Sequence, residues 1–140
     1  MKAVIQVPEL PHGDELRFIE RIIAFEQDHL RCAVRHPLPE AVRGPRVPSW
    51  WGVEIAAQAA GILLALKNNG STQGVDGRLV QIRSIRLSGS TLPVAARLEV
   101  STELKSSASF GLNLFDCRIR LAETDEEVLK AMLNLLVMAS

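Results

Sequence analysis

The chain of 140 residues lacks an excess of charge of either sign. Lysine and arginine together number 16, aspartate and glutamate also number 16, and the formal net charge is zero at pH 7. Without a net positive field, no binding of nucleic acid or of an anionic membrane surface is expected. The hydrophobic content of 47% is well above a disordered composition, and the length suits one domain, spanning residues 1–140.

Cysteine is also scarce. Cys32 and Cys117 lie far apart and form no C-x-x-C pair, so they are predicted to be buried thiols in a reducing compartment. The first ten residues are too short and too interrupted for a signal peptide. A cytoplasmic protein is therefore expected.

Several motifs that carry chemistry are missing. The stretch from Gly70 to Gly74 has no lysine and no preceding strand, so it does not match a phosphate-binding loop. His12, His29 and His36 are not at metal-ligand spacing with either cysteine, and no metal is predicted. A G-x-S-x-G nucleophile elbow is absent as well.

The most informative stretch that is present runs from Pro48 to Leu66 and is apolar on almost every side. It ends at a basic residue followed by two asparagines and a glycine, which favour termination of a helix. Because no polar face is left, the pattern predicts a buried central helix. The helix is nearly long enough to cross a bilayer, but Glu54 and Gln58 argue against a membrane span.

Glu54 and Gln58 lie four residues apart, on one face of this helix. A carboxylate in a buried helix is costly unless it is paired, protonated or used in chemistry. Glu54 is therefore a candidate catalytic residue. The alternative is a structural carboxylate that caps its own helix or pairs with one of the twelve arginines.

Most other segments read as β-strands, which makes the chain α+β. The expected strands are Phe18–Phe25, Leu30–Val34, Arg78–Leu87, Val94–Leu104 and Phe110–Leu121. A switch of apolar phase at Leu114–Phe115 indicates a bulge or bend. The segment Glu126–Met138 fits a helix that begins with a capping box of Thr124 and Glu127, and it also alternates like a strand. The pattern alone favours the helix.

The central helix resembles that of the β-hydroxyacyl-acyl carrier protein dehydratases, in which a proline precedes the acid of an E-x-x-x-Q motif. Here Pro48 lies six residues before Glu54, and Gln58 is followed by Ala59 and Ala60. The match extends over nearly the whole chain and is most similar to the dehydratase-like proteins of aryl polyene clusters. It implies a dimeric hotdog fold, in which a curled antiparallel sheet wraps a long helix, and it makes Glu126–Met138 a strand.

The resemblance implies a lyase that eliminates water from a 3-hydroxyacyl thioester in fatty acid or polyene/polyketide synthesis. Its partner would be an acyl carrier protein, and no cofactor is implied beyond the phosphopantetheine thioester that carries the substrate. Elimination needs a base at C2, an acid for the departing hydroxyl, and donors for the enolate-like oxygen. The acid would be Glu54, and the residues predicted to bind substrate are Ser49, Trp50, Trp51, Gly52 and Gln58.

The roles of these substrate-binding residues rest on different arguments. The backbone N–H groups of Ser49 to Gly52 are expected to supply the donors, since the first N–H groups of a helix have no partner within it. Trp50 and Trp51 either line a tunnel for an acyl or aryl chain or provide ordinary packing. Five arginines are candidates to receive a phosphopantetheine phosphate or an acidic carrier, with scattered surface arginines as the alternative: Arg43, Arg46, Arg78, Arg83 and Arg86.

The expected base is less well marked. The family places a histidine in a G-H-F-P-G motif shortly before the proline, where this chain has Arg43-Gly44-Pro45-Arg46. His36, twelve residues before Pro48, is the candidate base, unless it merely ends a strand. Two other functions are therefore kept open. One is a non-catalytic hotdog subunit that completes the site of an active partner, whereas the dehydratase itself would be a homodimer or a heterodimer. The other is a hotdog thioesterase, in which Glu54 would activate water.

Overall fold

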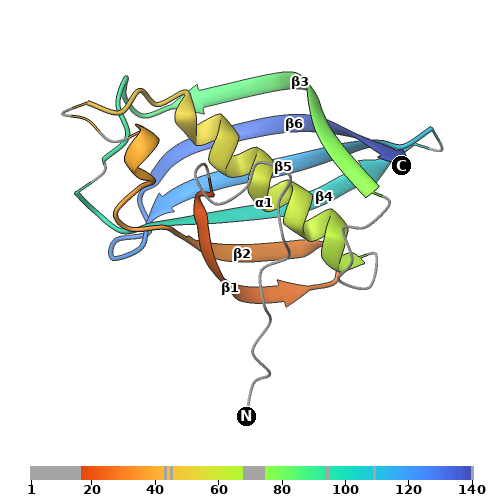
Figure 1. Ribbon diagram of the computed structural model, residues 1–140, viewed down its shortest axis with the longest axis horizontal. Helices are drawn as coiled ribbons and strands as arrows, with labels where there is room; N and C mark the ends of the chain where they lie inside the picture. The colour runs from red at the N-terminus through yellow and green to blue at the C-terminus, as the bar shows by residue number, and fades with distance from the viewer. Residues whose placement is uncertain are drawn as a thin grey trace, which may run out of the picture.

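A computed structural model of the protein describes residues 17–42, 44, 46–67, 75–93, 95–108 and 110–139. Within these residues one α-helix, α1 (Trp51–Lys67), packs on one face of an antiparallel sheet whose strand order is β1-β2-β4-β5-β6-β3 (Figure 1). A short 3-10 turn, η2 (Glu40–Val42), lies between β2 and the helix. The strands are β1 (Ile19–Glu26), β2 (His29–Val34), β3 (Val75–Leu87), β4 (Leu98–Ser107), β5 (Leu112–Leu121) and β6 (Glu127–Ala139).

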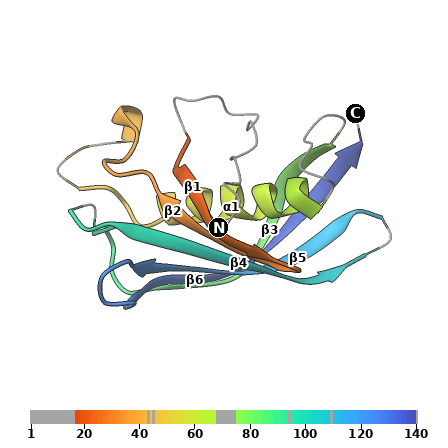
Figure 2. The same cartoon turned by 90° about the horizontal axis from the view of Figure 1, so that it is seen from below.

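The sheet curves around the helix, as the view from below shows (Figure 2). Small side chains at Ala56, Ala59 and Ala60 are fully buried, so the sheet approaches the helix closely. Larger apolar residues fill the space between the two layers; they include Ile55, Ile62, Leu63, Val100, Phe115, Ile119 and Leu133. The buried central helix and the α+β class predicted from the sequence are both confirmed.

Gly52 marks the closest approach of the helix to the sheet. A Cβ atom at this position would lie 2.7 Å from Leu129 Cδ1 and 3.3 Å from Ile119 Cδ1, both in the core. We therefore expect Gly52→Val to lower the free energy of unfolding by about 1–3 kcal/mol, as overpacking of a filled core does. Urea denaturation followed by circular dichroism measures this change.

Gly61 provides a matched control on the same helix. A Cβ atom there meets no heavy atom within 4 Å, so Gly61→Ala should keep or raise stability because alanine is the better helix former. Equal stability of the wild type and Gly52→Val would contradict the close packing.

The segment that was ambiguous in sequence is strand β6, which pairs with β5 on one side and β3 on the other. Leu129, Ala131 and Leu133 alternate toward the helix and are fully buried. The helix favoured by pattern alone is wrong, and the strand implied by the family resemblance is right. Thr124 does not cap a helix: its Oγ1 accepts a hydrogen bond from the Glu126 N–H at 3.3 Å, within the turn before β6.

The irregularity expected in β5 lies on the neighbouring strand instead. The register passes from Leu104 opposite Phe115 to Ser106 opposite Leu114, so the extra residue belongs to β4. Strand β5 alternates without a break, and the apolar phase seemed to switch because Leu112 and Leu114 are half-buried on its outer side. The strand expected from residue 94 begins only at Leu98, because Ala96 N–H bonds back to Pro93 O in a turn.

The two cysteines are buried free thiols, as predicted. Burial raises the pKa of both the Cys32 and the Cys117 thiol to about 12, and a hydrogen bond with Thr102 partly opposes this effect at Cys117. Such thiols are unreactive at neutral pH because the thiolate is the nucleophile. Within the described ranges, no helix has the length and apolar character needed to cross a bilayer.

Candidate active site

Glu54 lies half-buried in the first turn of α1, and its carboxylate accepts a hydrogen bond from Gln58 one turn later. The Gln58 side chain is buried, and its Nε2 donates to Glu54 Oε1 at 3.3 Å. Its Oε1 accepts the backbone N–H of Phe18 at 2.9 Å. Because that N–H can only donate, the amide must turn its NH₂ group toward Glu54. Gln58 thus links the Glu54 carboxylate to the Phe18 backbone, while its predicted contact with substrate stays a prediction.

Phe18 connects this pair to the open end of the β1–β2 hairpin, opposite the turn that joins the two strands. Its carbonyl accepts the Arg35 N–H at 2.6 Å, just beyond the end of β2. His36 follows directly and is half-buried. Hydrogen bonds from Phe18 to Gln58 and from Arg35 to Phe18 thus bring the backbone next to His36 to this end of the hairpin. The role of His36 as base stays a prediction. Phe18 was not predicted as a site residue, because its contact with Gln58 spans 40 positions along the chain.

A row of aromatic rings runs from Phe18, at the open end of the hairpin, to the surface. Phe18 is buried and lies 5.8 Å from the Trp51 ring, measured between centroids. Trp51 in turn stacks on Trp50 at 4.6 Å, and Trp50 is 59% exposed. The two tryptophans precede Glu54 by three and four residues, so they lie near its face of the helix. They thus extend the row of rings from the buried Phe18 to the surface at the start of the helix.

The expected set of four backbone donors is reduced by hydrogen bonds within the chain. Ser49 N–H donates to Ser90 O at 2.9 Å, Trp51 N–H to Pro48 O at 3.1 Å and Gly52 N–H to Ser49 O at 2.8 Å. The Ser49 hydroxyl also donates to Gly89 O at 2.6 Å. The helix thus begins with tight i→i−3 bonds. Among the described residues, the Trp50 N–H is the one predicted donor without an acceptor.

The structure thus collects the predicted residues of the helix at one end of α1: Ser49, Trp50, Trp51, Gly52, Glu54 and Gln58. Gly52 and Ser49 are buried there as packing and anchoring residues. Across the part of the chain that the structure describes, no three His, Cys, Asp or Glu side chains are grouped so as to hold a metal ion.

Solved structures with the same architecture include a dehydratase and two thioesterases. The dehydratase heterocomplex ApeI:P from Xenorhabdus doucetiae has a TM-score of 0.76 at 18% identity, covering 91% of this chain and 86% of that one. A mutant of thioesterase PA1618 from Pseudomonas aeruginosa has a TM-score of 0.68 at 14% identity, with 98% and 99% coverage. A hypothetical thioesterase from Streptococcus pneumoniae, solved with coenzyme A, has a TM-score of 0.62 at 17% identity, with 86% of both chains covered.

At these identities the structural likenesses establish the hotdog fold and leave the activity to other arguments. No curated protein matches the sequence. The sequence model of the ApeP-like family, described as ApeP dehydratase, matches residues 7–139, which is nearly the whole chain. The protein therefore belongs to the ApeP-like family of dehydratases.

Proposed function

We propose that the chain takes part in the dehydration of 3-hydroxyacyl thioesters carried on an acyl carrier protein, with Glu54 as the acid. A base removes a proton at C2, the C2–C3 double bond forms, and the hydroxyl leaves as water with a proton from Glu54. General acid–base chemistry of this kind requires no cofactor in the protein. The observation that carries the proposal is the buried Gln58 bridge, which holds a half-buried carboxylate at the helix entrance.

The product formed from a 3-hydroxyacyl-carrier substrate tests this function. Mass spectrometry of the carrier distinguishes an enoyl thioester from the unchanged substrate and from a carrier freed by hydrolysis. We expect the enoyl thioester. Release of the free acid without any enoyl intermediate would instead indicate a thioesterase.

The Trp50 N–H is proposed to hold the thioester carbonyl as negative charge develops on its oxygen. Replacing Trp50 by its α-hydroxy analogue turns this amide into an ester and removes the N–H while keeping the indole. We expect turnover to fall by about 10²-fold, as when one oxyanion donor is deleted. The same replacement at Trp51 is the control, because that N–H already binds Pro48 O. Equal turnover of the two esters would exclude Trp50 as the donor.

The proposed partner is a second hotdog chain that covers strand β3. This strand lies at the edge of the sheet, next to β6 alone. It carries an apolar row that faces the helix side, because the residues paired with it in β6 are buried there. The β3 apolar row consists of Leu79, Ile82, Ile85 and Leu87, which are 38–45% exposed. A second sheet joined at this edge would cover the row and bury well over about 1,000 Å² in total.

The base is proposed to come from this partner rather than from His36. The helix signature that places the acid is intact, whereas the histidine motif of the family is missing from the loop before Pro48. A hotdog protein with an intact G-H-F-P-G motif is the expected partner. The site would then combine the partner's histidine with Glu54.

A further inference from the structure

A cavity of about 280 Å³ lies on the outer face of the sheet, the face turned away from α1. The β5 residues that line it alternate with Phe115, Cys117 and Ile119, whose side chains are fully buried on the helix side. The outward side chains that line the cavity are His29, Ser101, Glu103, Asp116, Arg118 and Arg120. None of these six is apolar, so the cavity suits a polar ligand and not an acyl chain.

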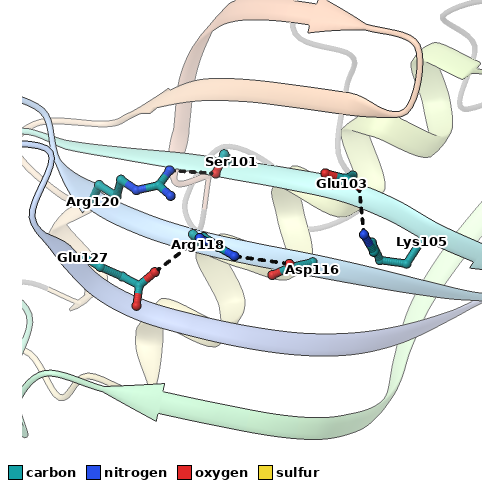
Figure 3. A network of polar contacts seen from close by, with 7 residues as sticks. All are labelled: Ser101, Glu103, Lys105, Asp116, Arg118, Arg120 and Glu127. Carbon is teal, nitrogen blue, oxygen red and sulfur yellow. Dashed lines mark hydrogen bonds and ion pairs between the residues drawn. The ribbon is translucent and has the colours of Figure 1, made fainter.

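The cavity forms because a small side chain stands among long ones. Ser101 of β4 is in register with Arg31 of β2 on one side and with Arg118 of β5 on the other. Arg120 reaches across the strands toward Ser101, and Arg118 turns toward Asp116 (Figure 3). The short serine side chain therefore lies at the floor of a depression, and longer side chains form its rim.

The charges in the cavity are separated along the strands. Glu103 and Asp116 lie directly opposite each other at one end, with His29 opposite Glu103. Arg118 and Arg120 follow Asp116 on β5, so the cations begin about 7 Å further along, at roughly 3.3 Å per residue. The two carboxylates and the two guanidinium groups balance each other. The cavity is thus dipolar, acidic at one end and basic at the other.

Asp116 carries an acceptor without a donor. Its Oδ1 atom is buried and has no hydrogen-bond partner among the described residues. Its Oδ2 atom lies 3.7 Å from Arg118 Nη2, which is longer than a hydrogen bond. Buried polar atoms nearly always have a hydrogen-bond partner, so each exception needs an explanation. This oxygen fits a ligand that brings an N–H donor into the cavity.

The two guanidinium groups also keep donors for a ligand. Arg118 lies 3.9 Å from Glu127, and Arg120 lies 3.9 Å from Asp125, whose side chain is 89% exposed. Neither distance is that of a hydrogen bond. Arg120 Nη1 donates to Ser101 Oγ at 3.5 Å, and this is the one hydrogen bond of the two groups within the described ranges. Since each guanidinium group has five N–H donors, most are left to bind a carboxylate, which this planar group recognises through two parallel bonds.

We propose that this cavity binds a small zwitterion, whose ammonium group donates to Asp116 Oδ1 and whose carboxylate accepts from Arg118 and Arg120. A ligand with both charges matches a dipolar cavity, whereas a plain anion or cation would meet a like charge at one end. Hydrogen bonds between charged groups are the strong ones. The volume is near the lower limit of ligand pockets, about 300 Å³, so the ligand has few atoms beyond its two charged groups. The site is independent of the proposed dehydration, since the sheet lies between it and the helix that carries Glu54.

Isothermal titration calorimetry with glycine, β-alanine and γ-aminobutyrate tests the proposal, because this series increases the distance between ammonium and carboxylate. At least one of the three should bind, and at least about tenfold more tightly than butyrate or butylamine, each of which lacks one of the two charges. If none of the three binds at millimolar concentration, or if the single-charge compounds bind equally well, the proposal is wrong and the cavity holds only water.

Asp116→Asn and Arg120→Gln should each weaken binding of that zwitterion by at least about tenfold, since each removes one charged contact. Glu123→Gln and Arg97→Gln are the matched controls, because they remove the same charges at exposed positions outside the cavity. Both controls should bind like wild type. Equal affinity of the wild type and both cavity variants would overturn the proposal. If circular dichroism shows that a cavity variant fails to fold, the comparison with butyrate and butylamine on the wild type decides.

Discussion

Glu54→Gln is expected to abolish dehydration by the assembled protein while leaving the fold intact. Glutamine has nearly the same volume as glutamate, and its carbonyl oxygen can still accept the hydrogen bond from Gln58 Nε2. It has no proton of suitable acidity to give to the leaving hydroxyl. A positioned acid contributes about 10²–10⁴-fold to a rate, so kcat should fall by that factor.

The measurement pairs turnover with thermal unfolding, so that a chemical role is separated from a structural one. Glu40→Gln removes an exposed carboxylate from η2 and should change neither quantity. If Glu54→Gln shifts the melting temperature and keeps its turnover, the carboxylate is structural and the proposed acid is wrong. Gln58→Met would then be expected to mimic that loss of stability.

The purified chain alone is expected to turn over 3-hydroxyacyl-carrier substrates very slowly, and addition of a hotdog partner with the G-H-F-P-G histidine should raise the rate by about 10²–10⁴-fold. This result is expected because the chain supplies the proposed acid, Glu54, and the partner supplies the base. In the complex, His36→Asn should leave turnover within about twofold of wild type, while loss of the partner's motif histidine should abolish it.

His36 is the alternative base, and the same assay exposes it. Rapid turnover by the chain alone, lost in His36→Asn, would place the base in this chain and contradict the proposed division of the site. His29→Asn is the control. His29 is exposed at the start of β2, at the opposite end of the hairpin from Phe18 and Arg35.

The central helix could be predicted from the sequence. An apolar stretch that begins after a proline and ends at a basic residue fits few structures other than a buried helix. The sequence was insufficient for β6, where apolar residues fit both a period of two and a helical period. The decision comes from the strands on either side, which supply hydrogen bonds that a helix would make within itself. Family resemblance resolved this segment because it carried that three-dimensional context.

The residues of the candidate site could be named from the sequence, but the contacts between them could be predicted only in part. Glu54 and Gln58 share a helix face by spacing alone, but the Phe18 N–H that orients Gln58 comes from a distant strand. The donors were overcounted for the same reason. The Ser49 N–H donates to Ser90 O, which lies in the loop after β3. Nothing in the sequence around Ser49 indicates that this loop contacts the start of the helix.

That loop would give the proposed partner an influence on the site from a distance. Residues 88–92 follow β3 directly and clamp the start of α1, through Ser49 on Ser90 and Gly89 and through the Leu92 N–H on Val47 O. A strand docked on β3 would restrain this clamp and, through it, the helix turn that presents the Trp50 N–H. Thermodynamic linkage then works in both directions: a partner that steadies the donor favours substrate, and bound substrate tightens the hold on the partner by the same factor.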